Sequence, residues 1–188
     1  MKRTLLLLLL LAACKPEVVA TPDPVPLTEE AVGHYCQMDL LEHPGPKAQV
    51  HLDGLPGQPL FFSQVRDAVA YTRLPEQSHT ILAVYVNDMG AAPSWEQTGP
   101  LNWIAAKGAH YVVGSAREGG MGAPELVPFA DAAKAEAFAA ENGGTVMTLD
   151  AIPDEAVIAP VVLEGDIGAG DDADYDARLR KLTQKAGG

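Results

Sequence analysis

Short runs of apolar residues, separated by polar turns, predict two structural units of similar plan in the middle of the chain. The elements expected for the first unit are a strand at 49–52, a strand at 60–62, a helix from about 63 to 72 and a strand at 81–86. Ser63 is a residue type that caps helices. Val65, Ala68 and Val69 follow it at a spacing that places them on one helical face.

The second half of the chain repeats this order of elements. The pattern predicts a strand at 110–114, a strand at 126–129, a helix over 131–141 and a strand at 145–149. Asp131 is suited to cap the helix, and Asn142-Gly143-Gly144 can end it by adopting left-handed backbone conformations. We therefore expect an α+β fold made of two small strand-strand-helix-strand subdomains.

A segment rich in proline and glycine, Gly90 to Pro100, separates the two units and has the composition of a linker. It places the boundary between an N-terminal subdomain at 31–97 and a C-terminal subdomain at 98–153. The two units together are long enough to bury a core without disulfide bonds.

The first thirteen residues have the pattern of a signal peptide, with Lys2 and Arg3 followed by a run of leucines. That apolar run is about half the roughly 20 residues that a membrane-spanning helix needs. Leu11-Ala12-Ala13-Cys14 resembles a bacterial lipobox, which predicts cleavage before Cys14 and lipidation of its sulfur. The alternative is an ordinary secretory signal that leaves Cys14 as a free thiol. Either interpretation predicts export.

The two ends of the mature chain lack the pattern of folded elements. Residues 14–30 are rich in proline and poor in large apolar groups, which predicts an extended, lipidated tether. Residues 154–188 include an acidic stretch at 166–176 and are expected to form a disordered tail. The protein is therefore expected to be held at the periplasmic side of a membrane by lipid, with the inner and outer membranes both open.

Charge and cysteine content narrow the classes of function. The formal net charge is −12, which argues against nucleic acid as a partner because phosphate binding depends on Lys and Arg. The chain has two cysteines. If Cys14 carries lipid, Cys36 is a single thiol in an oxidising compartment, where exported proteins normally pair their cysteines. A bound soft metal ion would both use and protect such a thiol.

Cys36 lies two residues before Met38, so the two side chains point to the same face if this segment is extended. A thiolate and a thioether together are soft ligands that favour copper(I). Another interpretation is that both residues fill the core, since Met and free Cys commonly do so. On that interpretation the protein is a purely structural lipoprotein.

Two further residues are candidates for the same site. Met121 lies between glycines in Gly119-Gly120-Met121-Gly122, a loop that exposes its side chain and lets it move, as suits a third soft ligand. The equally weighted alternative is a hairpin tip with Met121 packed against the neighbouring sheet. His34, two residues before Cys36, is a possible supporting ligand.

The sequence does not have the motifs of the common enzyme classes. It contains no Gly-x-Ser-x-Gly, no His-Glu-x-x-His, no phosphate-binding loop and no dinucleotide-binding fingerprint. Cys36 and His34 form a conceivable nucleophile-base pair, but residues two apart rarely reach that geometry. We therefore expect a binding protein that is not an enzyme.

Taken together, these motifs resemble the NosL family of copper chaperone lipoproteins. The matching segments are Cys14, Cys36-x-Met38 followed by Glu42-His43-Pro44-Gly45-Pro46, the run from Trp103 to Ser115, Gly120-Met121-Gly122, Glu125 to Phe129 and Gly143-Gly144. Family members usually have Cys-Gly-Met where this chain has Gln37 in the middle. Both sulfur ligands are retained despite this change.

The resemblance implies that Cys36, Met38 and Met121 bind copper(I), and that the copper is delivered for assembly of the copper centres of nitrous oxide reductase. The implied partners are that reductase, the NosDFY membrane transporter, or both. The alternative is a periplasmic lipoprotein for copper scavenging or tolerance without a specific recipient. The expected fold is also similar to that of organomercurial lyases, but their chemistry needs a cysteine pair that this chain lacks after lipidation.

Overall fold

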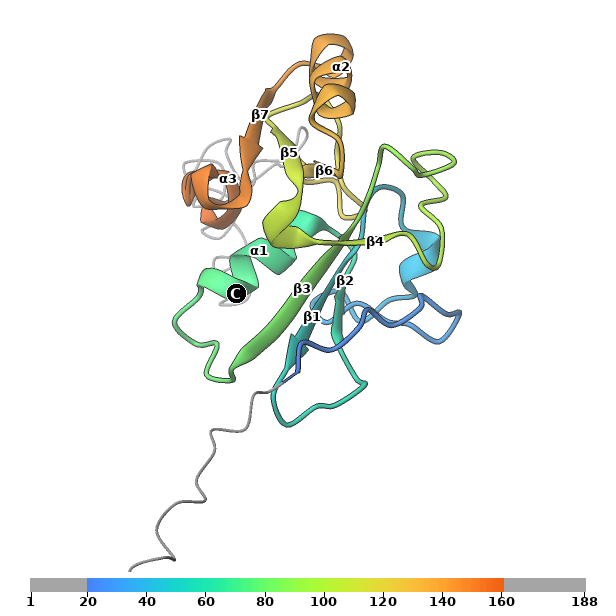
Figure 1. Cartoon of the computed structure of the whole chain (residues 1–188), viewed down its shortest axis with the longest axis vertical. Helices are drawn as coiled ribbons and strands as arrows, with labels where there is room; N and C mark the ends of the chain where they lie inside the picture. The colour runs from blue at the N-terminus through green and yellow to red at the C-terminus, as the bar shows by residue number, and fades with distance from the viewer. Residues whose placement is uncertain (1–19, 161–188) are drawn as a thin grey trace, which may run out of the picture.

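The computed structural model describes residues 20–160, in which a four-stranded and a three-stranded antiparallel sheet lie one above the other (Figure 1). The first sheet has the strand order β2-β1-β3-β4, and the second has the order β6-β5-β7. The strands are β1 (Ala48–Leu52), β2 (Leu60–Phe62), β3 (Ile81–Asn87), β4 (Trp103–Ala105), β5 (His110–Val113), β6 (Val127–Phe129) and β7 (Thr145–Thr148). The α+β class and the two small antiparallel sheets are as expected from the sequence.

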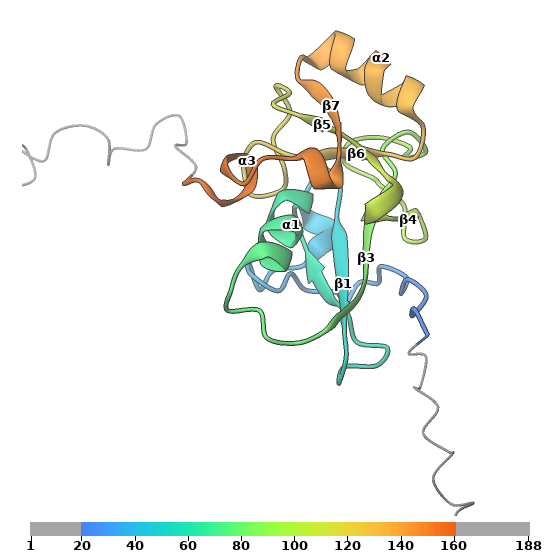
Figure 2. The same ribbon diagram turned by 60° about the vertical axis from the view of Figure 1, so that its left-hand side comes forward.

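Within residues 20–160, three α-helices and three short 3-10 helices accompany the sheets. The α-helices are α1 (Val65–Arg73), α2 (Ala132–Asn142) and α3 (Glu155–Ile158), and the 3-10 helices are η1 (Leu40–Glu42), η2 (Ala106–Gly108) and η3 (Leu149–Ala151). Helix α1 packs on β1 and β2, α2 packs on the second sheet, and α3 lies against α1 (Figure 2). Helix α1 thus covers one face of the first sheet and contacts the second unit through α3.

The α2 helix begins and ends as its sequence predicts. The Asp131 carboxylate accepts hydrogen bonds from the backbone N–H groups of Ala133 (2.7 Å) and Lys134 (3.3 Å), which have no partner within the helix. At the other end, Gly143 has φ 75°, a conformation that favours glycine. The local signals at this helix were therefore sufficient.

The N-terminus of α1 differs from the prediction that Ser63 caps it. Gln64 is the N-cap residue, and its own side chain makes no capping hydrogen bond. The Glu125 carboxylate takes this role from the second half of the chain, accepting from the backbone N–H groups of Val65 (3.3 Å) and Arg66 (3.0 Å). A cap from so distant a position leaves no local signal in the sequence.

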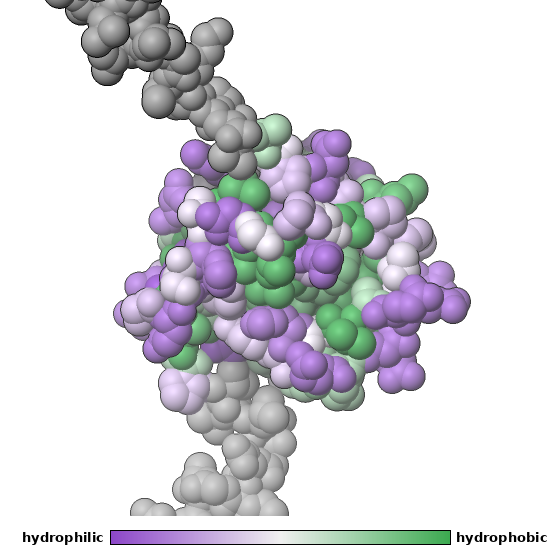
Figure 3. All heavy atoms as spheres, turned by 90° about the horizontal axis from the view of Figure 1, so that it is seen from below, coloured by the Kyte–Doolittle hydropathy of each residue, from purple (hydrophilic) through white to green (hydrophobic). Residues whose placement is uncertain are grey.

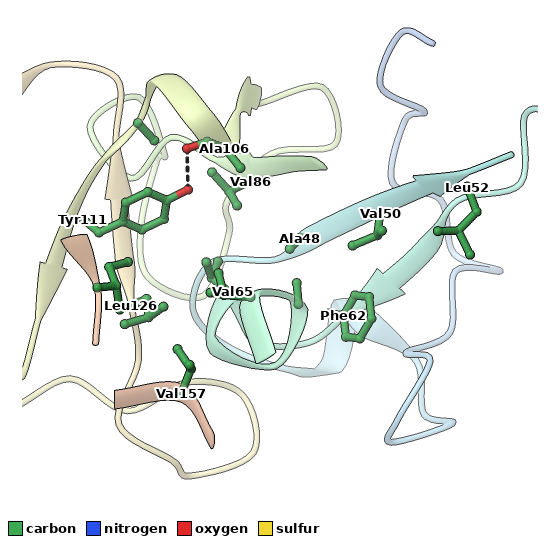
Figure 4. Close-up of a cluster of buried hydrophobic side chains, with 14 residues drawn as sticks. Ala48, Val50, Leu52, Phe62, Val65, Val86, Ala106, Tyr111, Leu126 and Val157 are labelled. Atoms are coloured by element: carbon green, nitrogen blue, oxygen red, sulfur yellow. Dashed lines mark hydrogen bonds between the residues drawn. The ribbon is translucent and has the colours of Figure 1, made fainter. Parts of the chain in front are cut away.

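One hydrophobic core joins the two units. Phe62 and Val50 of the first sheet, Val65 of α1, and Tyr111 and Leu126 of the second unit are all buried in the same cluster (Figure 4). The Tyr111 hydroxyl donates a 2.7 Å hydrogen bond to the carbonyl of Ala106 within this core. Burial of this much shared apolar surface favours a fixed arrangement of the two sheets.

The predicted boundary between the units assigns β4 to the wrong one. Residues 98–153 were expected to form the second subdomain, but β4 pairs with β3 and completes the first sheet, with Trp103 opposite Asn87. A strand of three residues carries too little periodicity to reveal which partner it joins.

The predicted tether and tail also extend too far into the chain. Leu27 is buried, its N–H donates to the Pro100 carbonyl (2.9 Å), and the N–H of Val25 donates to Gln49 Oε1 (2.8 Å). At the other end, Val157 of α3 is buried in the core. Residues 20–30 and 154–160 are therefore partly or wholly integrated in the fold. The predicted signal peptide, Cys14 and residues 161–188 lie outside the described residues.

Within residues 20–160, no helix is long and apolar enough to cross a bilayer. On the face shown in Figure 3, apolar residues gather in small patches between polar ones. Such patches are ordinary on protein surfaces.

Candidate metal centre

Cys36 and Met38 lie on a tight turn. The N–H of Gly33 donates to the Met38 carbonyl (3.0 Å), and the N–H of Gln37 donates to the Gly33 carbonyl (2.8 Å). The expectation of an extended segment, with the two sulfur side chains on one face of a strand, is therefore wrong here. The turn keeps the two residues close together by main-chain hydrogen bonds instead.

Gln37 has φ 55°, in the left-handed region that favours glycine. This backbone conformation gives a physical reason for the glycine usual at this position in the family that the sequence resembles. The Gln37 side chain supports the turn by donating to the carbonyls of His34 (2.7 Å) and Gly33 (3.3 Å). The turn therefore forms without glycine in the middle.

The Cys36 thiol is free and partly exposed, and the Met38 side chain is 45 % exposed. Gly33 faces the Cys36 sulfur so closely that a Cβ at position 33 would overlap with Sγ. Glycine at that position thus leaves the space in which the thiol lies. Both residues are thus at least partly exposed at the surface of the described structure.

The His34 ring belongs to an aromatic cluster. Its centroid lies 5.3 to 5.6 Å from those of Tyr35, Phe62 and Tyr71, and its backbone N–H donates to the Phe61 carbonyl (2.7 Å). His34 therefore contributes to attaching the turn to β2. Its role as a supporting ligand stays a prediction.

Met121 projects from a loop that is closely packed on the rest of the protein. Its side chain is 43 % exposed, and its backbone N–H donates to Gln64 Oε1 (2.9 Å). A Cβ at Gly120 would lie 2.6 Å from the His43 Cβ and 3.1 Å from the Ser63 carbonyl oxygen. Of the two alternatives, the structure has the exposed side chain, but the loop backbone is held by contacts and is not loose.

The two sulfur-bearing segments meet at residues 61–64, the junction between β2 and α1. The turn pairs with this junction through a bridge between Gly33 and Phe61. The loop contacts it two and three residues later, through Ser63 and Gln64. Three steps along the chain span at most about 11 Å, so the junction brings together segments that are far apart in the sequence.

His43 was not selected from the sequence, yet it adjoins the Met121 loop. Its Nδ1 lies 2.9 Å from the Gly120 carbonyl oxygen. A carbonyl only accepts, so Nδ1 carries the proton and Nε2 of the neutral ring has a free lone pair. Nε2 is buried without a hydrogen-bond partner. Histidines that bind metals commonly have this arrangement, with the second nitrogen bonded to a backbone carbonyl.

The sequence signal for His43 is its position five residues after Met38. His43 and His51 are eight residues apart in the sequence, unlike the close spacing of zinc-binding histidines. In the structure His51 lies within β1, and its Nε2 is hydrogen-bonded to Gln49 Oε1 (2.8 Å). The neighbour of His43 in space is therefore the loop at 119–122, 77 positions beyond it at Gly120.

A buried lysine supports the segment that carries His43. Lys47 Nζ donates to the carbonyls of His43 (2.6 Å) and Gly45 (2.5 Å). Burial lowers the pKa of Lys47 to about 8, opposed by the carboxylate charge of Glu125. The ammonium group thus fixes the turn at 43–45 through backbone contacts.

Glu125 connects the loop with the helix at the same junction. Besides capping α1, its carboxylate accepts from the N–H of Leu126 (2.8 Å). Burial raises the pKa of Glu125 to about 8, although the backbone N–H donors favour the ionised form. A Cβ at Gly119 would overlap with this carboxylate, so glycine is needed where the loop crosses it.

A groove of about 780 Å³ opens beside His43, between residues 27–30 and the loop at 93–100. Its apolar lining includes Leu41, and its carboxylates are Glu29, Glu30 and Glu96. Within residues 20–160, His, Cys, Asp and Glu side chains form no group of three or more that could hold a metal ion.

Comparisons with known proteins agree with the family resemblance. The family model described as NosL matches residues 24–157. The chain is 58 % identical over 182 residues to the copper-binding lipoprotein NosL of Achromobacter cycloclastes, covering 96 % of this chain and 93 % of that protein. It is 34 % identical over 145 residues to the copper-binding lipoprotein NosL of Stutzerimonas stutzeri, covering 77 % and 73 %.

The fold also matches a solved structure. The crystal structure of the copper chaperone NosL from Shewanella denitrificans superposes with a TM-score of 0.65 at 30 % sequence identity. The match covers 71 % of this chain and 97 % of that one. The family model and the two relatives each extend over more than two thirds of the sequence, so the chain belongs to the NosL family.

Proposed function

We propose that this protein is an exported copper(I) carrier in which Cys36, Met38 and Met121 bind one ion. The observation that carries the proposal is the meeting of both sulfur-bearing segments at residues 61–64. The proposed recipient is nitrous oxide reductase, whose copper centres would be assembled from the delivered ions, directly or together with the NosDFY transporter. The protein itself performs no catalysis in this proposal.

The chemistry of the three side chains supports copper(I) as the cargo. One thiolate and two thioethers are soft donors, which copper(I) prefers over the oxygen ligands suited to magnesium or calcium. Met38 and Met121 are 45 % and 43 % exposed, so an incoming ligand from a recipient can approach an ion bound between them. Exposure of this kind favours transfer by ligand exchange over permanent storage.

His43 is proposed as an additional nitrogen ligand. Its Nε2 lone pair is buried and unpartnered, and Nδ1 is fixed by the backbone of the Met121 loop. Leaving a buried polar atom without a partner costs about 1–3 kcal/mol. A metal ion bound at Nε2 would remove that cost.

The names of the relatives support the same function. Two are copper-binding lipoproteins, and the matching solved structure is that of a copper chaperone. For this chain we propose lipidation at Cys14 and a periplasmic location at the membrane surface.

A copper(I) titration against a chromogenic chelator, done anaerobically, tests the binding proposal. We expect one ion per wild-type chain, and an affinity at least about tenfold lower in Cys36→Ser and in Met121→Ala. Met89→Leu is the matched control, because Met89 packs partly buried against a core cluster. Equal affinity in all four proteins would exclude this site.

Delivery requires a separate measurement. The copper-loaded protein is mixed with copper-free nitrous oxide reductase, and the absorption of the assembled copper centres is followed. We expect faster and more complete assembly than with the same copper supplied by the chelator. Equal assembly from both sources would favour scavenging without a specific recipient.

A further inference from the structure

Gln64 connects the Met121 loop to the N-terminus of α1. Its side chain is 2 % exposed. The amide oxygen accepts from the backbone N–H of Met121 (2.9 Å) and of Ala123 (3.4 Å), and the amide nitrogen donates to Asp67 Oδ2 (3.1 Å). Every polar atom of this side chain is thus directed either to the loop or to the helix.

The loop and α1 each supply a side-chain acceptor for backbone N–H groups of the other. Gln64, at the N-cap of α1, supplies an acceptor to the loop instead of to its own helix. Glu125, at the end of the loop, supplies the acceptor that the free N–H groups of α1 require. Each segment therefore satisfies buried donors of the other.

Asp67 fixes the orientation of the Gln64 amide. A carboxylate can only accept, so the amide nitrogen must face Asp67, and the amide oxygen must face the loop. With the opposite orientation, an amide N–H would point at the N–H of Met121. The hydrogen bond to the Met121 N–H therefore depends on Gln64 and Asp67, neither of which is a proposed metal ligand.

From this geometry we infer that Gln64 is a positioning residue for the third copper ligand, with Asp67 as its partner. The inference rests on the proposed function, because it assigns a role within that site. A preorganised ligand loses less conformational freedom on binding than a mobile one. Loss of the Gln64 acceptor should therefore weaken copper(I) binding as much as loss of the Met121 sulfur does.

The test compares Gln64→Leu, Met121→Ala and the double variant by copper(I) competition titration. We expect each single variant to lose roughly tenfold in affinity and the double variant to lose no more than Met121→Ala alone. X-ray absorption at the copper edge should show one sulfur scatterer fewer in Gln64→Leu. A merely structural role for Gln64 would leave the set of scatterers unchanged.

Two control variants separate positioning from general destabilisation. Gln49→Leu removes another buried glutamine, whose amide bonds to the backbone of Val25, and should keep wild-type affinity. The pair Gln64→Glu with Asp67→Asn keeps the net charge and restores an acceptor towards the loop and a donor towards position 64. This double variant should recover most of the lost affinity.

The outcomes are distinct for the inference and for the function on which it depends. If the wild-type protein does not bind copper(I), the proposed function and this inference both fail. If the wild type binds and Met121→Ala weakens binding while Gln64→Leu does not, the inference alone is overturned. Additive losses in the double variant would also overturn it, because they would mean that Gln64 acts independently of Met121.

Discussion

The turn at 33–38 and the loop at 119–122 both contact the junction at 61–64, but the contacts that attach them are of different kinds. The hydrogen bonds that join the turn are between main-chain groups, through the bridge from Gly33 to Phe61 and the N–H of His34, and the His34 ring also packs against Phe62. The loop is joined through side chains, by Gln64 to the backbone of Met121 and by His43 to that of Gly120.

This difference predicts different sensitivity to substitution. Main-chain hydrogen bonds persist when side chains change, so the position of the turn is affected mainly by residues that clash or alter backbone conformation. The position of the loop depends on particular amide, imidazole and carboxylate groups. Substitutions of those groups should displace Met121 while leaving Cys36 in place.

The largest expected effect is on folding stability and concerns Glu125, which lies next to the loop at 119–122. Burial raises the pKa of Glu125 from its ordinary value of 4.5 to about 8. The folded state then holds the proton more tightly than the unfolded state, so this group stabilises folding below pH 4.5 and its contribution is lost as the pH rises through about 8. The total loss is on the order of 5 kcal/mol, and most of it occurs between pH 5 and pH 8.

Urea unfolding at pH 5 and pH 8 measures this effect. We expect the free energy of unfolding of the wild type to fall between these values, and the slope to flatten in Glu125→Gln. The variant loses one acceptor for the N–H groups of α1, which should cost about 1 kcal/mol at both pH values. An unchanged slope would show that Glu125 stays ionised over this range.

A smaller effect is expected on the turn from Gly33→Ala. The added Cβ would overlap with the Cys36 sulfur, so the thiol must move away from its position. We expect copper(I) affinity to fall by roughly tenfold, about 1.4 kcal/mol. Gly108→Ala is the matched control, because a Cβ there meets no atom within 4 Å.

Substitutions of Gln37 test how far the turn at 33–38 depends on the backbone conformation of this residue. Its φ of 55° is costly for a β-branched residue, so Gln37→Val should lower the free energy of unfolding by about 1 kcal/mol. Gln37→Gly should keep a copper(I) affinity close to that of the wild type. A thermal melt and a titration on each variant check this, and equal behaviour of valine and glycine would contradict the role of φ.

The smallest effect is expected for Tyr111→Phe, which touches neither segment. The lost hydroxyl removes one hydrogen bond to the Ala106 carbonyl, but that oxygen also accepts from the N–H of Ala109 (3.3 Å). We expect a loss of about 0.5–1 kcal/mol in the free energy of unfolding, measured in urea. A change in copper(I) affinity would show that the core and the site are coupled.

Local patterns were sufficient for most of the fold. Apolar periodicity located both long helices and six of the seven strands to within a few residues, because those elements bury a regular face. It failed for β4 and α3. These elements have three and four residues, too few to show a period, and their places depend on distant contacts.

For the candidate site, too, some residues could be predicted from the sequence and others could not. Cys36, Met38 and Met121 were selected because sulfur ligands in an exported chain have a chemical meaning that does not depend on the fold. Gln64 and His43 were missed, since a glutamine before a helix and an isolated histidine are ordinary in sequence. Their importance comes from contacts across 57 and 77 positions, which no local pattern encodes.

The shared junction has a consequence for thermal motion. Both segments are fastened to the same four residues, so small displacements of one sheet against the other should carry the turn and the loop together. The spacing of the sulfur atoms would then stay nearly constant while the rest of the molecule fluctuates. Copper affinity should accordingly show little dependence on temperature or mild denaturant until the junction itself unfolds.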